Sequence, residues 1–197
     1  MRLSTKSALL FAAACALSTG ASAHTGHGTQ SLMQGLAHPF GADHLLAMLA
    51  VGIWSVSALP ANKVWQGPAT FMLALVVSAL AGASGFTVPF LEHAIALSVS
   101  LFGLMLILAA KPVPKAFGLT LIALAASLHG LAHGAETPAT GFAGYAVGFL
   151  LTTAALHLGG VGIGLSIRRQ LAARSASVFG GLGTLFGLAG LVLFSQI

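Results

Sequence analysis

Charged residues are scarce in this 197-residue sequence. They make up 6% of it, whereas hydrophobic residues make up 57%. Soluble domains are about a quarter charged, and a chain this apolar could not form a soluble surface. The sequence therefore predicts an integral membrane protein. Its net charge of +5 does not indicate nucleic-acid binding, because the basic residues stand in short clusters between apolar runs, as topology signals do.

Cysteine and nucleotide-binding motifs are also missing from the part of the chain expected to form the mature protein. Cys15 is the only cysteine, and it lies in an N-terminal targeting segment. Disulfides and thiolate metal sites are therefore excluded from the mature protein. The sequence has no G-x-x-x-x-G-K-[ST] loop and no room for an ATPase domain, which excludes an ATP-driven pump within this chain.

Residues 1–23 have the pattern of a signal peptide. Arg2 and Lys6 precede the apolar run SALLFAAACAL, and ASA at positions 21–23 is a small-residue cleavage site. We expect the mature chain to begin at His24 and to form a single domain over residues 24–197. The alternative is an uncleaved first helix.

Six apolar runs follow the signal peptide, each near the length of about 20 residues that crosses a bilayer. They lie at residues 32–59, 68–84, 90–110, 116–135, 141–166 and 177–195. The connections between them are short and carry Pro, Gly or Lys and Arg. The sequence therefore predicts an all-α integral membrane bundle of six transmembrane helices.

The loop charges predict how this bundle is oriented. Every Lys and Arg after the signal peptide falls in the first, third or fifth connection: Lys63, Lys111, Lys115, Arg168, Arg169 and Arg174. Lys and Arg near span ends mark the cytoplasmic side. Both mature termini are thus expected in the periplasm, with the protein in the bacterial inner membrane.

Glycines in the last two spans show small-xxx-small spacing, which lets helix backbones approach closely. The pairs are Gly144 and Gly148, Gly160 and Gly164, and Gly183 and Gly187. They predict tight packing, either within one bundle or at an interface between protomers of a homo-oligomer.

The three acidic residues of the sequence all lie close to histidines. They are Asp43, which is next to His44 and five residues after His38; Glu92, which is next to His93; and Glu136, which is three residues after His133 and seven after His129. In the expected orientation, all three groups fall in the outer half of their spans. Ionisable residues in spans normally face the bundle interior and pair with each other or with an ion. These residues are therefore candidate metal ligands.

The segment HGLAHGAE has a helical geometry that suits a metal. His129, His133 and Glu136 are spaced i, i+4 and i+7, so one helical face carries all three. Two imidazoles one turn apart can share a divalent metal, and a carboxylate one turn further can neutralise it. A structural hydrogen-bonding pair is the alternative.

The stretch HPFGADH places three polar side chains in the first span. On a regular helix His38, Asp43 and His44 would point in different directions. Pro39 removes a backbone donor and disfavours a helical conformation at His38. We therefore expect a kinked or partly unwound outer end of this span that lines a polar cavity.

The remaining histidines are less informative. Glu92 and His93 are adjacent and cannot share a helical face, so they are either ligands or polar residues at the membrane interface. His157 lies deep in the fifth span, either as a second station on an ion path or as a hydrogen-bonded core histidine. His24 and His27 would lie at a free periplasmic N-terminus.

HPFGADHLLAM and HGLAHGAE, in a six-span protein behind a signal peptide, resemble the HupE/UreJ family of nickel or cobalt permeases, which serve hydrogenase or urease. The resemblance covers essentially the whole mature chain. It implies metal-binding roles for His38, Asp43, His44, His129, His133 and Glu136. Leu128 stands where the family has an aromatic residue, which concerns packing rather than binding.

The ligand types point the same way, because imidazole and carboxylate without thiolate suit Ni²⁺, Co²⁺ or Zn²⁺ rather than Cu⁺. We expect a secondary transporter, most consistent with Ni²⁺ uptake, that is not an enzyme and carries no resident cofactor. The alternatives are a Co²⁺ transporter, a membrane-embedded zinc hydrolase, a haem-binding electron carrier, and a metal sensor or scaffold that binds without transporting.

Overall fold

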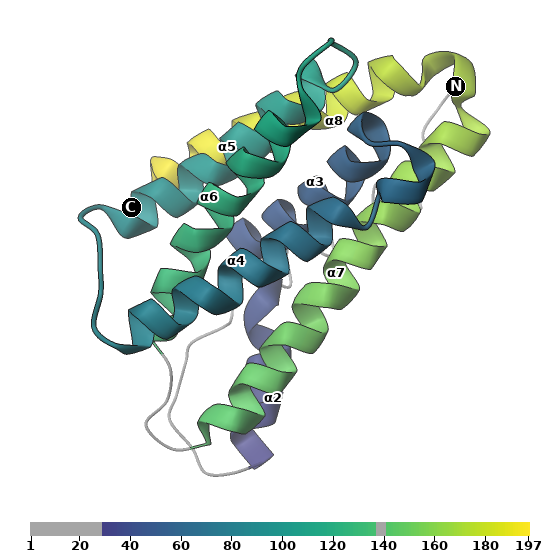
Figure 1. Cartoon of the computed structure of the whole chain (residues 1–197). Coiled ribbons are helices and arrows are strands. Elements are labelled where there is room, and N and C mark those ends of the chain that lie inside the picture. Colours follow the sequence, from purple (N-terminus) through teal and green to yellow (C-terminus); the bar gives the residue numbers. More distant parts are fainter. Residues whose placement is uncertain (1–28, 137–140) are drawn as a thin grey trace.

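The computed structural model describes residues 29–136 and 141–197, and these residues form helices and no strand (Figure 1). The expected signal peptide, residues 1–23, lies outside the described residues, as do His24 and His27. The long helices are α2 (Thr29–Ala37), α3 (Ala42–Ala58), α4 (Gln66–Ala83), α5 (Leu91–Leu108), α6 (Lys115–Ala135), α7 (Phe142–Gln170) and α8 (Ser175–Phe194). Three short 3-10 turns join them: η2 (His38–Phe40), η3 (Ala61–Lys63) and η4 (Ala172–Arg174).

The helices confirm the expected all-α membrane bundle. Five of them are long and apolar enough to cross a membrane, and the number reaches six if the bent pair 31–40 and 42–58 is one span. The span boundaries agree to within a few residues, except that α7 continues beyond residue 166 to Gln170. Within this extension, the Nη1 of Arg168 donates a hydrogen bond to the carbonyl of Val56, 2.9 Å away, near the end of α3.

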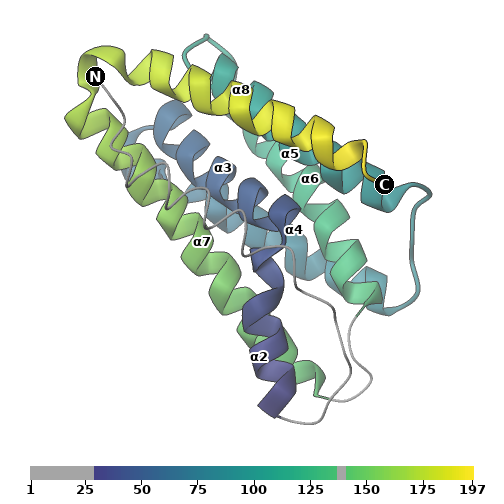
Figure 2. The same ribbon diagram turned by 180° about the vertical axis from the view of Figure 1, so that it is seen from behind.

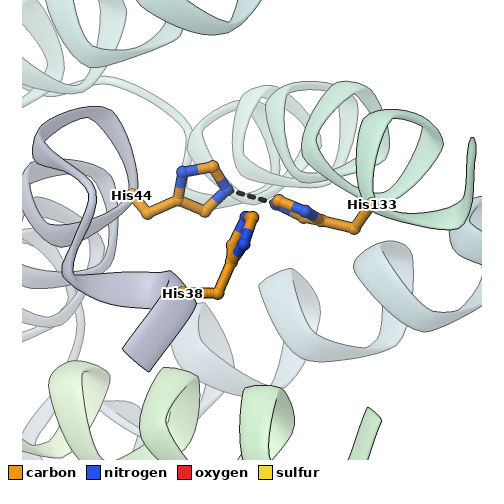
Figure 3. A group of neighbouring side chains, drawn as sticks. All are labelled: His38, His44 and His133. Carbon is orange, nitrogen blue, oxygen red and sulfur yellow. Dashed lines mark hydrogen bonds between the residues drawn. The ribbon is translucent and has the colours of Figure 1, made fainter. Parts of the chain in front are cut away.

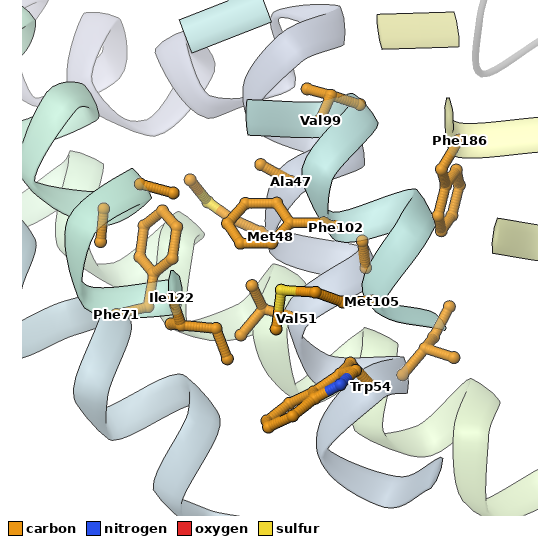
Figure 4. Packing of buried hydrophobic residues seen from close by; sticks show 14 of the residues in the cluster. Ala47, Met48, Val51, Trp54, Phe71, Val99, Phe102, Met105, Ile122 and Phe186 are labelled. Atoms are coloured by element: carbon orange, nitrogen blue, oxygen red, sulfur yellow. The ribbon is translucent and has the colours of Figure 1, made fainter. Parts of the chain in front are cut away.

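Helix α3 is the central helix of the bundle. It packs against α4, α5, α7 and α8, while α4 pairs with α6, α5 with α8, and α2 with α7 (Figures 1 and 2). Its central residues are nearly all buried, and Met48, Val51 and Trp54 meet Phe71 of α4 and Phe102 of α5 in the core (Figure 4). The core therefore fixes α3 against its neighbours just below the residues that carry the site.

The first span is broken where the sequence predicts it. Helices α2 and α3 meet at an angle of 68°. Pro39 has no N–H to continue the helical hydrogen bonds of α2, and η2 closes instead with the Gly41 N–H donating to the His38 carbonyl at 3.1 Å. The expected kink is therefore present, but the segment before it is not unwound, because it forms the separate helix α2.

The charged residues are divided between the two ends of the bundle. All Lys and Arg residues of the described chain lie at one end, where α3, α5 and α7 finish, which we call the basic end (Figure 1). Asp43, Glu92 and Glu136 lie where α3 and α5 begin and α6 finishes, which we call the acidic end. The alternation of loops that underlies the expected orientation is therefore present in the fold.

Most of the paired glycines lie at helix contacts within this chain. A Cβ added at Gly148 would overlap the backbone of α2, one at Gly160 the backbone of α3, and one at Gly183 the backbone of α5. The expected tight packing is thus present inside the bundle. An interface between protomers stays a prediction.

Gly160 and Gly162 provide a matched test of this packing. Gly160→Ala places a methyl group against the α3 backbone, whereas a Cβ at Gly162 meets nothing within 4 Å. We expect Gly160→Ala to destabilise the protein by about 1–3 kcal/mol through overpacking. Gly162→Ala should be neutral or stabilising by up to about 1 kcal/mol, because alanine favours helix over glycine. Thermal unfolding of the purified variants in one detergent measures both, and equal midpoints would contradict the packing described here.

Candidate metal centre

Three histidines from two separate parts of the chain converge at the acidic end of the bundle. His38, His44 and His133 each offer a ring nitrogen, and these nitrogens all lie within 4.8 Å of one another. Figure 3 shows the three rings pointing toward a common point from the α2–α3 segment and from α6. His44 Nε2 and His133 Nε2 contact each other directly.

The break in the first span brings two of these rings together. His38 begins the 3-10 turn, and His44 lies in the first turn of α3. Their ring centroids are 5.6 Å apart, and each is close to His133, at 4.7 Å from His38 and 4.4 Å from His44. A straight helix would have separated the first two rings, so the bend creates the cluster.

The spacing of the three rings suits one bound divalent ion. Imidazole nitrogens lie about 2.0–2.1 Å from a bound zinc ion, so two ligands of one ion are at most about 4.2 Å apart. Small side-chain rotations bring nitrogens within 4.8 Å into that range. His44 and His133 are buried and His38 is partly buried. The cluster therefore offers an ion a largely dehydrated set of nitrogen ligands.

Asp43 is hydrogen-bonded to His44, beside the group of three histidines. Its Oδ1 accepts a hydrogen bond from His44 Nδ1 at 3.0 Å. With its proton on Nδ1, the ring presents an unprotonated Nε2 to the cluster. A carboxylate behind a ligating histidine raises the basicity of that ligand and fixes its orientation. Asp43 also supplies a negative charge beside the site.

His129 lies one turn before His133 on α6 and forms the inner side of the cluster. Its Nδ1 is 3.3 Å from His44 Nε2, and its Nε2 is 3.0 Å from the hydroxyl of Ser98 on α5. His129 is fully buried. It therefore ties the cluster to α5. Its Nδ1 already faces His44, so it can serve as a fourth nitrogen ligand while its Nε2 keeps the hydrogen bond to Ser98.

Several residues around the cluster could not be found from the sequence. Phe149 of α7 packs on the His133 ring with centroids 4.5 Å apart, and Tyr145 stands at 5.8 Å from the His38 ring. The hydroxyl of Ser98 is hydrogen-bonded to the His129 ring. Isolated aromatic and hydroxyl residues in apolar spans have no spacing signal, and only the packing of α5 and α7 against the cluster gives them a role.

Glu136 and Glu92 lie at the acidic end of the bundle, outside the group of three clustered histidines. Glu136 follows the last residue of α6, and both glutamates are partly exposed to solvent. Partial burial raises the pKa of Glu136 above its usual value, and the nearby negative charge of Glu92 raises it further. Two carboxylates close enough to affect each other attract a cation to the acidic end.

His93 and His157 are outside the group of histidines that contact one another. His93 packs between Phe90 and Phe194, with centroid distances of 5.9 and 5.2 Å. His157 is buried in the middle of α7, where its Nδ1 donates to the Thr153 carbonyl at 2.8 Å. The structure thus brings four of the sequence-predicted histidines together with Asp43. It places Glu92 and Glu136 at the acidic end, and it leaves His93 and His157 outside the cluster.

Comparison with known proteins identifies relatives of this sequence. A family model described as HupE / UreJ protein matches residues 12–193. A protein from Rhizobium leguminosarum bv. viciae, named Protein HupE, is 39% identical over 183 residues, which cover 91% of this chain and 94% of that relative. No solved structure matches. The chain therefore belongs to the HupE/UreJ family, whose members are membrane permease or accessory proteins, not enzymes, associated with nickel or cobalt uptake for hydrogenase or urease.

Proposed function

We propose that this protein carries Ni²⁺ inward across the bacterial inner membrane by secondary transport, for the maturation of nickel enzymes. The observation that supports this most strongly is the convergence of His38, His44 and His133 inside a membrane bundle. Imidazole nitrogens backed by a carboxylate suit a late first-row divalent ion. Co²⁺ is the second candidate, because the same ligands accept it.

In this proposal, the ion is drawn first to the acidic end. Glu92 and Glu136 attract the ion there. The ion then exchanges bound water for the nitrogens of His38, His44 and His133. Asp43 holds the His44 ring in the tautomer that binds, and its charge offsets part of the cost of bringing a dication out of water. His129 continues the set of nitrogens toward the interior.

The membrane potential is sufficient to drive the uptake. Moving one elementary charge across 100 mV is worth about 2.3 kcal/mol, so an inward-moving dication gains about 4.6 kcal/mol when the cytoplasm is negative. Since about 1.4 kcal/mol corresponds to a factor of ten, this supports accumulation of more than about a thousandfold. The basic end, expected to face the cytoplasm, agrees with inward transport from the periplasm.

Removing a nitrogen ligand tests the proposal directly. We expect His44→Ala and His133→Ala each to reduce accumulation of radioactive Ni²⁺ in intact cells by about 10–100-fold, because each leaves two of the three converging imidazoles. His93→Ala is the matched control, since its ring packs outside the cluster, and it should retain uptake. Immunoblots of membranes establish equal protein levels. Unchanged accumulation in both ligand variants would disprove the proposal.

Asp43→Asn tests the role of the carboxylate separately from the ligands. Asparagine keeps the shape and a hydrogen bond to His44 but removes the negative charge. We expect the Ni²⁺ concentration for half-maximal uptake to rise by about 10–100-fold, with a smaller change in the maximal rate. A change confined to the maximal rate would instead assign Asp43 to the movement of the ion.

Competition distinguishes the two candidate ions. If Ni²⁺ is the physiological cargo, unlabelled Ni²⁺ should compete with radioactive Ni²⁺ uptake at lower concentrations than Co²⁺ or Zn²⁺ does. Stronger competition by Co²⁺ would reassign the cargo while leaving the site in place. Because all three ions accept nitrogen ligands, the comparison measures the fit of the cluster rather than the ligand type.

A further inference from the structure

Three buried side-chain nitrogen or oxygen atoms in the described chain have no hydrogen-bond partner. One is His133 Nδ1, in the cluster already described, and the other two are His157 Nε2 and Thr153 Oγ1. Native proteins pair nearly all buried polar groups, and an unpaired one indicates an absent water or ion. Thr153 and His157 are one helical turn apart on α7, so their free atoms lie on one face.

The tautomer of His157 suits a ligand. Its Nδ1 donates to the Thr153 carbonyl at 2.8 Å, so in a neutral ring the lone pair is on Nε2. This is how histidine ligands are usually held, with one nitrogen bonded to a backbone carbonyl and the other free to coordinate. The side chains of Thr153 and His157 are 0% and 1% exposed. The free nitrogen therefore cannot be satisfied by bulk solvent.

His157 is also adjacent to the inner side of the histidine cluster. The ring of Phe71 packs against both His129 and His157, with centroid distances of 5.7 Å to His129 and 4.9 Å to His157. Helix α3 packs closely here as well, because a Cβ added at Gly52 would overlap the His157 carbonyl. One aromatic ring thus contacts both His129 of the cluster and His157 of α7.

We propose that Thr153 and His157 form an inner, hydrated station for the transported divalent ion, reached after the histidine cluster. This inference rests on the proposed function. His157 Nε2 and Thr153 Oγ1 supply two neutral ligands, and the ion keeps water for the rest of its coordination. A site with two neutral ligands binds weakly, and conduction requires an inner site from which the ion can leave.

Two substitutions of His157 separate a ligand from a structural role. The amide of His157→Asn reaches the position of Nδ1 and can keep the hydrogen bond to the Thr153 carbonyl, but nothing replaces Nε2. In His157→Gln the amide reaches the position of Nε2 instead. We expect His157→Asn to lower Ni²⁺ uptake into proteoliposomes with a negative interior by about tenfold or more. His157→Gln should retain a larger share of the uptake.

Thr153→Val gives an independent test with a neighbouring control. Valine removes the free hydroxyl at nearly constant shape, and we expect a several-fold fall in Ni²⁺ uptake. Thr152→Val removes a hydroxyl that already donates to the Leu36 carbonyl at 2.9 Å, and it should leave uptake close to wild type. If both His157 variants fold poorly, the comparison of Thr153→Val with Thr152→Val still tests the inner station.

Equilibrium dialysis of the full-length purified protein with Ni²⁺ completes the test. His157→Asn and Thr153→Val should keep the tight Ni²⁺ binding of the histidine cluster, whereas His44→Ala should lose both this binding and uptake. Wild-type uptake in His157→Asn or in Thr153→Val would overturn the inner station and leave the proposed function intact. Better uptake in His157→Asn than in His157→Gln would overturn it too, because the Nδ1 hydrogen bond would then be what matters. Wild-type uptake in His44→Ala would count against the proposed function itself.

Discussion

The break between α2 and α3 is the constraint on which the metal centre depends. Pro39 cannot donate a hydrogen bond to the preceding turn, so the helix ends and the chain turns by 68° before α3 begins. The turn is held from outside: Gly35 of α2 lies against the backbone of α7 at Tyr145, and Gly148 of α7 lies against α2. With α2 fixed in this way, His38 meets His44 and His133, which a continuous helix would have kept apart.

The environment of the cluster then determines its chemistry. In an apolar bundle, a polar group is stable only when it is paired, and the described residues meet this requirement unevenly. Asp43 pairs with His44 and Ser98 with His129. His133 Nδ1, Thr153 Oγ1 and His157 Nε2 are left without partners. A site that carries an ion benefits from such incomplete pairing, because ligands already satisfied by protein must lose a bond before they can bind.

Much of this could be predicted from the sequence because membranes impose strong rules on composition. Spans of about 20 apolar residues, basic loops and the scarcity of acids follow from the cost of placing charge and unpaired backbone in lipid. The same cost makes the few intramembrane histidines and acids stand out as candidates. Pro39 further predicts the break. Hydropathy did not predict the extension of α7 to Gln170, because its last three residues are polar, and the contact of Arg168 with the α3 carbonyl of Val56 has no sequence signal.

The sequence by itself determined the class of fold, the positions of the spans and the short set of residues that can bind a metal. Only the tertiary structure decided which of them meet. Spacing treats His93 and His38 alike as histidines near an acid, but the packing of α5 and α8 holds His93 between phenylalanines, while the bend brings His38 into the cluster. The tertiary structure also places Asp43 in a hydrogen bond with His44, which the sequence alone did not show. The reason is physical: spacing fixes the direction of a side chain only within one helix, whereas a metal site depends on the distances between helices.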